Sequence, residues 1–236
     1  MVLFWLNQCY IIYSTTQIIA YNKGEHQMNI TIIGSGNMTK AIATRFLGGN
    51  HNVTVHAKDV IKGQALVDDL SKNGGEITVQ PIGNVIKDEV VILAVPYTEI
   101  SNIATQYDNF AGKIVVDITN PLDFTTFQLI PAAGTSGAEE IAKLLPSAKV
   151  VKGFNSAFAA TLIAGEVDGQ KLDIFIAGDD AVSKQVVGEM IETSGMRVVD
   201  AGPLSHARHL EGLALIHIMV QDQLKTGWMS AIKIIG

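Results

Sequence analysis

The chain has 236 residues, of which 47% are hydrophobic, 17% charged and 6% aromatic, and its formal net charge is −6. This length and apolar content suit one large or two small globular domains and exclude a disordered chain. A single cysteine excludes an internal disulfide framework and a cysteine-based zinc cluster, so a cytoplasmic protein is expected, and the lack of Lys/Arg runs argues against nucleic-acid binding.

Residues 1–27 differ in pattern from the rest of the chain. Their apolar bursts are interrupted by polar residues, so none reaches transmembrane length, and no basic residue precedes Lys23 as a secretory signal would require. Three interpretations remain: translation begins at Met28, the segment adds a strand or helix to the domain, or it is a weak membrane-surface anchor. The first is favoured, because Met28 leads directly into a predicted strand.

From residue 29 onward, short β-branched runs alternate with helical patterns. Most runs are continuously apolar, as strands buried on both faces must be. The sequence therefore predicts an α/β fold, a doubly wound and mostly parallel (Rossmann) sheet with a small C-terminal α/β extension. The predicted strands are residues 29–33, 52–55, 76–79, 89–94, 113–117, 149–152, 172–176 and 196–199, and the predicted helices are residues 37–47, 136–145, 180–193 and 205–225.

A glycine-rich turn joins the first predicted strand to the first helix, which is the setting in which such turns bind dinucleotides. Gly34 permits the tight turn, and Gly36 lets the backbone approach a pyrophosphate at the helix N-terminus. Thr39 replaces the third glycine of the usual motif and is not expected to face the phosphates. A glycine turn without a ligand is the alternative. The candidate cofactor-binding residues here are Gly34, Ser35, Gly36, Asn37 and Met38.

The second strand ends without the acidic residue that usually holds the ribose hydroxyls of NAD. Lys58 follows the strand instead, and a cation at this place suits the 2′-phosphate of NADP. Asp59, one residue further on, is expected to begin the next helix. The sequence therefore favours NADP(H) over NAD(H), with a merely solvated Lys58 as the alternative. This strand end adds His56, Ala57 and Lys58 to the cofactor-binding candidates.

Ligands of doubly wound sheets bind outside the carboxyl ends of the strands, so later strand ends are candidates too. The strands over 89–94 and 113–117 contribute Ala94, Val95, Pro96, Asn120 and Pro121 as cofactor-binding candidates. Residues 119–135 lack periodicity, which is typical of a functional or mobile loop. Asn155 either binds a carboxamide or ring carbonyl, or is a turn residue that bonds its own backbone.

The helix predicted over 205–225 carries histidines and a wide apolar face. His206 and His209 are three residues apart, but no H-E-x-x-H pattern or acidic partner accompanies them, so no metal site is predicted. The apolar face is typical of a core or a dimer interface. Arg208 and Glu211 share one face of the helix, where an intrahelical ion pair is expected at least as much as a ligand contact.

One block of the chain is specific enough to suggest a family. Residues 200–211 read DAGPLSHARHLE and resemble the hallmark of the NADPH-dependent deazaflavin (coenzyme F-420) reductases; the pattern is also similar to that of the cytosolic NADPH–flavin domain of six-transmembrane metalloreductases. The resemblance covers essentially residues 28–236 and includes the turn at 34–38, Lys58, the Val-Pro pair at 95–96 and the run 152–155. The deazaflavin reductases have His at the position of Asn155, whereas the flavin-using relatives have Asn.

The resemblance implies an NADPH-dependent oxidoreductase that transfers hydride between NADP(H) and a flavin or deazaflavin (coenzyme F-420) acceptor. It implies direct ring-to-ring transfer, which needs positioning rather than an acid–base pair. Gly202, Pro203 and Leu204 are then expected to shape the acceptor pocket, and Phe154 and Asn155 are expected to lie near the reacting rings.

The resemblance also implies a division of the chain. Residues 28–150 are expected to form the dinucleotide-binding domain, and residues 151–236 a segment for acceptor binding and dimerisation. The partners expected are a small-molecule acceptor and a second copy of the chain, with no nucleic acid and no membrane for residues 28–236.

Two other functions stay open. A pyrroline-5-carboxylate-type imine reductase has a similar opening, G-x-G-N-M-x-x-A, which matches residues 34–41. That family ends in a long helical domain, whereas this chain continues with predicted strands. A non-catalytic module that senses NADP(H) is the other alternative. Ring-to-ring hydride transfer requires no acid or base, so the lack of such residues does not distinguish an enzyme from a sensor. Fold alone distinguishes none of these.

Overall fold

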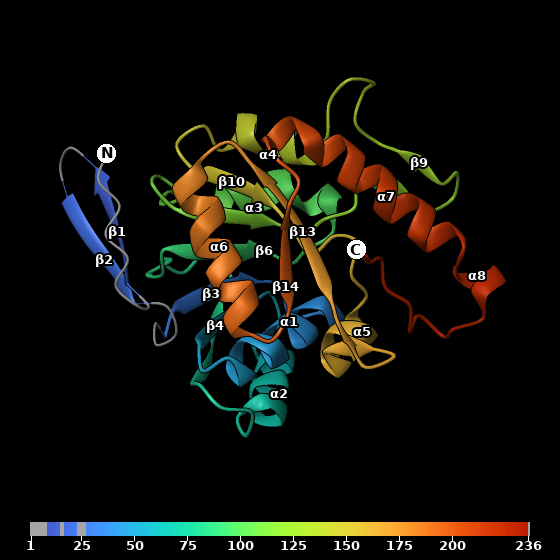
Figure 1. The fold of residues 1–236 in the computed structure, drawn as a ribbon. Coiled ribbons are helices and arrows are strands. Elements are labelled where there is room, and N and C mark those ends of the chain that lie inside the picture. The colour runs from blue at the N-terminus through green and yellow to red at the C-terminus, as the bar shows by residue number, and fades with distance from the viewer. Residues whose placement is uncertain (1–8, 15–16, 23–26, 236) are drawn as a thin grey trace.

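The computed structural model describes residues 9–14, 17–22 and 27–235. It confirms the predicted fold, because the eight strands predicted from residue 29 onward form one sheet in the order β14-β13-β10-β7-β6-β3-β4-β5, with helices on both faces (Figure 1). The strands of this sheet are β3 (Asn29–Ile33), β4 (Asn52–Ala57), β5 (Ile77–Pro81), β6 (Val90–Leu93), β7 (Ile114–Asp117), β10 (Lys149–Lys152), β13 (Asp173–Gly178) and β14 (Arg197–Asp200).

The sheet is parallel except at one junction. Strands β5, β4, β3, β6, β7 and β10 run in the same direction, whereas β13 pairs with β10 in the antiparallel sense and β14 runs parallel to β13. The C-terminal extension is therefore a reversed pair of strands added to the same sheet. The boundary expected at residue 150 falls inside β10, and the division into two domains stays a prediction.

Two hydrophobic layers cover the sheet. Side chains alternate along the inner strands, so that Ile92 of β6 enters one layer and Leu93 the other. The layer that contains Ile92 packs against α1 (Asn37–Gly48), α2 (Val60–Leu70), α5 (Ala159–Ala164) and α6 (Ala181–Thr193). The opposite face is covered by α3 (Ile100–Gln106), α4 (Gly137–Leu144) and α7 (Ala207–Met219).

Side-chain caps begin three helices at the expected places. The Asp59 carboxylate accepts a hydrogen bond from the amide of Lys62, which confirms that this residue begins α2 rather than ending β4. Ser136 Oγ accepts from the Glu139 amide at 3.2 Å, and this cap begins α4 at the predicted position. Asp180 caps α6 in the same way.

The prediction of one helix over 205–225 was wrong in detail. A 3-10 turn, η2 (Leu204–His206), precedes α7, and α7 ends at Met219 before a separate short helix, α8 (Gln221–Leu224). The loop over 119–135 contains a small hairpin of β8 (Leu122–Asp123) and β9 (Gln128–Leu129). The other short elements are η1 (Tyr97–Glu99), β11 (Glu166–Val167) and β12 (Gln170–Lys171).

Before residue 27 the structure describes a hairpin. Strand β1 (Cys9–Ser14) pairs with β2 (Gln17–Asn22) in a separate two-stranded antiparallel sheet, at the blue end of the chain in Figure 1. The rest of the segment discussed above, residues 1–8, 15–16 and 23–26, lies outside the described residues, and a start at Met28 stays a prediction. Within the described residues, no helix has the length and hydropathy of a membrane span.

Candidate cofactor-binding site

The strand order switches direction between β3 and β6, and we call the place outside the carboxyl ends of these two strands the crevice. The chain proceeds from β3 outward to β4 and β5 on one side, and then returns to β6, β7 and β10 on the other. The connections after β3 and β6 therefore diverge above their carboxyl ends, which is where dinucleotides bind in doubly wound sheets. By the same rule, the adenine half of a bound dinucleotide would lie above β4, and its nicotinamide half would lie above β6 and β7.

Gly34 is required by the turn that leaves β3. Its φ is +122°, and a Cβ at this position would lie 2.2 Å from the carbonyl oxygen of Ala94. The turn is fixed on both sides, because the Gly34 amide donates to the His56 carbonyl and the Ala94 amide donates to the Ile33 carbonyl, each at 2.9 Å. Only glycine combines this conformation with so close an approach of two backbones.

The first turn of α1 is open toward the crevice. Gly36 is the N-cap residue, no side chain caps the helix, and its first turn contains no acidic residue. A Cβ on Gly36 would meet no heavy atom within 4 Å. The first hydrogen bond of this turn runs from the Lys40 amide to the Gly36 carbonyl at 3.1 Å, so the earlier amides of the turn have no helical partner. This arrangement fits a pyrophosphate held by backbone N–H groups.

The three candidate residues at the end of β4 differ in their exposure to solvent. His56 and Ala57 are buried, whereas Lys58 is exposed directly beyond the strand. His56 Nδ1 lies 2.9 Å from the Tyr107 hydroxyl, and burial lowers the pKa of this histidine although the nearby Asp88 opposes the shift. The His56 side chain is therefore engaged inside the domain, and Lys58 is the residue of the three that is free to meet a phosphate.

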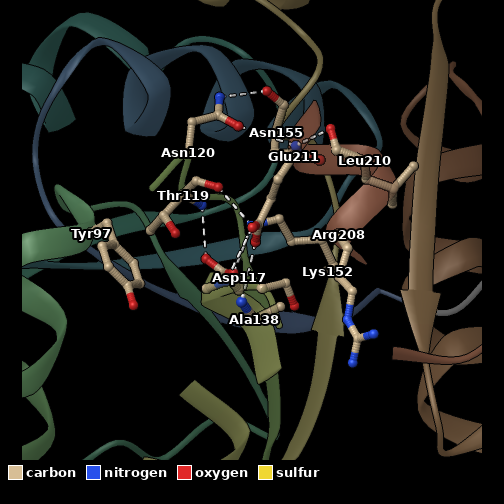
Figure 2. A network of polar contacts seen from close by, with 12 residues as sticks. Tyr97, Asp117, Thr119, Asn120, Ala138, Lys152, Asn155, Arg208, Leu210 and Glu211 are labelled. Carbon is tan, nitrogen blue, oxygen red and sulfur yellow. Dashed lines mark hydrogen bonds and ion pairs between the residues drawn. The ribbon is translucent and has the colours of Figure 1, made fainter. Parts of the chain in front are cut away.

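The strand ends beyond the crevice are joined to one another. Ala94 and Val95 are half-buried and Pro96 is exposed after β6, while Pro121 is buried after β7. Asn120 Nδ2 donates to the Asn155 carbonyl at 2.8 Å, and Asn155 Nδ2 donates to Asn120 Oδ1 at 3.1 Å. The turns after β7 and β10 thus form one connected edge (Figure 2).

Asn155 does not bond its own backbone, so the turn-residue alternative was wrong. Its amide also donates to the Leu210 carbonyl of α7 at 2.9 Å, which links the sheet edge to the C-terminal helix. Phe154 has a left-handed φ of +60° and a buried ring that packs edge-on against Phe46, with centroids 5.9 Å apart. The Phe154 side chain points into the core, so only its backbone lies along the edge.

A buried charged network lies just beneath this edge, and the sequence reasoning missed it. Lys152 Nζ lies 2.8 Å from Asp117 Oδ2, 3.0 Å from Glu211 Oε1 and 2.6 Å from the Thr119 carbonyl oxygen (Figure 2). The side chains of the lysine and both carboxylates are 0–1% exposed. A sequence signal existed, because Asp117 ends an otherwise apolar strand and Lys152 follows two apolar residues at the end of its strand.

Glu211, which lies in α7, also caps the N-terminus of helix α4. Its two carboxylate oxygens accept from the amides of Gly137 at 3.0 Å and Ala138 at 3.2 Å. The buried group contains two carboxylates but only one lysine. The positive end of α4 therefore stabilises the carboxylate of Glu211. Removal of one member of such a buried group costs about 3–5 kcal/mol, because it leaves an unpaired charge.

The predicted intrahelical pair of Arg208 and Glu211 was wrong. Arg208 instead binds Glu139 of α4, with Nε 2.7 Å from Oε2, and this hydrogen bond holds the pKa of Glu139 below its usual value despite partial burial. Tyr97 donates to Glu140 on the same helix, and burial together with that carboxylate raises the pKa of Tyr97. Three carboxylates therefore join α4 to its neighbours: Glu139 and Glu140 of α4 itself, and Glu211 of α7.

The turn proposed to shape the acceptor pocket lies apart from the glycine-rich turn. Gly202 follows β14, and five strand-to-strand steps separate β14 from β3, about 24 Å at the usual strand spacing. The Gly202 carbonyl accepts from the Gly178 amide at 3.0 Å, and Leu204 is buried in the layer beneath α4. Pro203 is exposed. The structure does not bring these residues to the cofactor turn, and their role stays a prediction.

The histidines of η2 and α7 do not form a set of metal ligands. The rings of His206 and His209 are tilted, with centroids 5.8 Å apart. His217 is buried and bonds the Ser156 carbonyl and the Ser230 hydroxyl. Among the described residues, no three His, Cys, Asp or Glu side chains are placed to hold a metal ion.

Comparison with known proteins identifies relatives that match these features. Residues 29–121 match the family described as "NADP oxidoreductase coenzyme F420-dependent". The chain is 30% identical to the F420-dependent NADP reductase of Methanocaldococcus jannaschii, an alignment that covers 84% of this chain and 95% of the archaeal protein.

A second relative is longer than this chain. Metalloreductase STEAP3 of Rattus norvegicus is 33% identical over 186 residues, which cover 79% of this chain and 36% of STEAP3. The chain thus spans about a third of the length of the metalloreductases that it matches. Among solved structures, one from Arthrobacter sp. FB24, described as a candidate F420-dependent NADP reductase, has a TM-score of 0.77 and 26% identity, covering 89% of this chain and all of that one.

Proposed function

The chain belongs to the family of coenzyme F420-dependent NADP oxidoreductases, and from that premise we propose that it transfers hydride between NADP(H) and a flavin or deazaflavin acceptor. The observation that carries the proposal is the uncapped N-terminus of α1 beside Gly36, with the exposed Lys58 one strand away. Together they supply backbone donors for the pyrophosphate and a cation for the 2′-phosphate.

When bound, NADPH supplies the hydride, and the chain supplies position. The amides at the start of α1 hold the pyrophosphate, and Lys58 holds the 2′-phosphate at the adenine end. The turns after β6, β7 and β10 border the nicotinamide half and orient its ring toward an acceptor. Such a transfer depends on near-contact distance between two rings and on exclusion of water, so it requires no acid or base from the chain.

The acceptor is proposed to stack at the edge formed by the ends of β7 and β10. Asn155 supports a flavin, since the sequence resemblance gives Asn at this position in the flavin-using relatives and His in the deazaflavin reductases. STEAP3, which shares a third of its length with this chain, is itself a metalloreductase. The archaeal relative is an F420-dependent NADP reductase, and its alignment covers nearly its whole length, which supports the deazaflavin.

The two alternative functions receive less support. An imine reductase of the pyrroline-5-carboxylate type would end in a long helical domain, whereas here β13 and β14 add strands to the sheet. A sensing module would bind NADPH with no turnover. No feature of the described site favours that module over catalysis.

Anaerobic oxidation of NADPH, followed by its absorbance, tests the proposal. Parallel reactions contain coenzyme F420, FMN or FAD. Rapid oxidation with one of them establishes the activity and identifies the ring system. Tight NADPH binding without oxidation in any reaction contradicts the proposal and favours the sensing module.

The cofactor preference has a test of its own. Lys58→Ala should weaken NADPH binding well beyond tenfold, since a charge-assisted phosphate contact is lost, and should leave NADH binding nearly unchanged. Titration of cofactor fluorescence measures both dissociation constants. Equal losses for the two cofactors would show that Lys58 does not contact the 2′-phosphate.

We also propose that a second copy of the chain pairs on α7 and α8. Three large apolar side chains are exposed along this stretch, Ile216, Met219 and Leu224. Exposed apolar patches of this kind mark interaction surfaces. Light scattering coupled to size-exclusion chromatography gives the molecular mass that checks it, and a monomer at micromolar concentration would contradict it.

A further inference from the structure

We propose that Glu211, Lys152 and Asp117 form a positioning unit that sets the place of the nicotinamide half of the cofactor. The inference rests on the proposed binding of NADP(H) and adds a task for residues that touch no cofactor themselves. The unit acts through the turn over 119–121, which follows β7 and borders the crevice on its nicotinamide side.

Strand pairing aligns the unit with the glycine-rich turn. Ile33 of β3 pairs with Leu93, Leu93 with Asp117, and Asp117 with Lys152, so these residues form one row across four strands. Gly34 directly follows the first member of this row. The buried charges therefore lie one residue beneath the carboxyl edge on which the cofactor is expected to rest, at the same height as the base of the glycine-rich turn.

Side chains of the unit bind the backbone of the turn over 119–121. Lys152 Nζ donates to the Thr119 carbonyl at 2.6 Å, and Asp117 Oδ1 accepts from the Thr119 amide at 2.8 Å. Both backbone groups of Thr119 are thereby fixed by side chains of the unit. Asn120, the next residue, is one of the cofactor-binding candidates, so its position follows from that of Thr119.

Helix α7 contacts the same edge at two places. Glu211 binds Lys152 beneath the edge, and the preceding carbonyl, that of Leu210, accepts from Asn155 at 2.9 Å. Asn155 in turn bonds Asn120. Two adjacent residues of α7 thus reach the turn over 119–121 by two separate routes, which fixes it more firmly than either contact alone.

Stability does not account for a group of this kind. Well-packed apolar side chains of similar volume stabilise a core as well as a buried ion pair does, or better, whereas a charged network fixes one geometry. Two polar atoms on this edge, Thr119 Oγ1 and Asn155 Oδ1, are buried and have no hydrogen-bond partner among the described residues. Unpaired buried polar atoms are rare in proteins and call for an explanation, and a polar group of a ligand at this edge would supply one.

The test compares two ligands that share the adenine half. NADPH contains the nicotinamide, whereas 2′,5′-ADP ends before it. Glu211→Gln should raise the dissociation constant of NADPH about tenfold, as expected for the loss of one contact. It should change the dissociation constant of 2′,5′-ADP by no more than about twofold. Arg208→Gln is the matched control, since it breaks a contact between the same two helices, α4 and α7, without touching the turn. It should change neither constant.

A second variant keeps the test independent of folding defects. Asn120→Ala alters a half-buried side chain on the turn without removing a buried charge, and it should show the same selective loss of NADPH binding. Equal weakening of both ligands by Glu211→Gln and Asn120→Ala, or no weakening of either, overturns the positioning role.

The failure of this inference differs from the failure of the proposed function. A wild-type protein that binds NADPH but oxidises it with no acceptor contradicts the proposed reaction, while the ratio of the two dissociation constants still tests the positioning unit. A protein that reduces a flavin or coenzyme F420 while Glu211→Gln binds NADPH normally contradicts only the positioning unit.

Discussion

Single residues of the glycine-rich turn have separable tasks. Gly34 serves the fold, because its positive φ and its closeness to the Ala94 carbonyl admit no side chain. Gly36 has an ordinary φ of −90° and open space around it, so the fold does not require glycine here, and a role in ligand binding is the prediction. The sequence already predicts a tight turn at Gly34 and an approach of the backbone to a pyrophosphate at Gly36; the structure confirms the first, and the second stays a prediction.

Substitution by alanine should expose this difference. Gly34→Ala should lower the free energy of unfolding by about 2 kcal/mol or more, since it adds a strained φ to a backbone clash. Gly36→Ala should leave stability almost unchanged but weaken NADPH binding, because the added methyl group occupies the approach to the pyrophosphate. Urea unfolding and cofactor titration measure the two effects. A Gly36→Ala variant that binds NADPH normally would show that the phosphates lie elsewhere.

Residue-level prediction succeeded where a local rule applies and failed where partners are distant in sequence. The sequence places Asp59 at a helix start because its charge suits a helix N-terminus, and Ser136 because it forms a capping pattern with Glu139, three residues on. The pairing of Glu211 with Lys152 spans 59 residues, so no spacing rule indicates it. The helical spacing of Arg208 and Glu211 pointed to the wrong pair, because tertiary partners were available to both.

At the scale of elements, strands were predicted better than their directions. Each of the eight strands of the central sheet was expected from its β-branched run, and the first six follow the expected parallel order. The reversal of β13 was not predicted, because a buried strand has the same apolar sequence in either direction. The six-residue helix α5 was missed since its residues are nearly all apolar or small and show no polar face.

A latch of charged contacts holds the segment after α8 against β13. The Asp173 carboxylate, which is fully buried, binds Arg197 of β14, Lys233 and the amide of Ile234. Burial alone would raise the pKa of this carboxyl group, but the hydrogen bonds from Arg197, Ile234 and Lys233 lower it on balance. Arg197 also donates to the Ile234 carbonyl, and Lys233 donates to the Lys171 carbonyl at 2.9 Å, so Asp173 is the acidic centre of several contacts that hold residues 233–235.

Removal of this charge should free the segment. Asp173→Asn should raise the hydrogen-exchange rate of the Ile234 amide at least tenfold and lower the free energy of unfolding by about 3 kcal/mol, since two cations lose a buried partner. Asp69→Asn, which breaks an exposed pair with Lys40, is the control and should cost less than about 1 kcal/mol. Unchanged exchange at Ile234 would show that the segment is held by other contacts.

For the whole molecule, buried histidines make stability depend on pH. Burial lowers the pKa of His51, His56 and His217, so all three are neutral in the folded protein near pH 6.5. The unfolded chain binds protons at these residues below about pH 6.5. Their contribution is therefore complete above that pH and is lost as the pH falls from 6.5 through the lowered pKa values of the folded state.

The expected result is a steeper loss of stability in mild acid than exposed histidines would cause. Each buried histidine contributes at most about 1.4 kcal/mol per pH unit within this window. Urea unfolding at pH 7.5, 6.5 and 5.5 measures the slope. His217→Gln should reduce it, whereas His209→Gln, at an exposed position, should leave it unchanged. Equal slopes in all three proteins would show that burial of His217 does not govern its protonation.

The latch at Asp173 has a further consequence for how the chain is made. Asp173 leaves the ribosome 61 residues before Ile234, its backbone partner. Throughout that interval the carboxylate lacks two of its donors, and a buried charge without partners is costly, so β13 gains by remaining in water. The six parallel strands are translated before this point, and they can assemble while the reversed pair waits. We therefore expect the final closure of the sheet to follow the synthesis of Lys233 and Ile234, the last of the donors to Asp173.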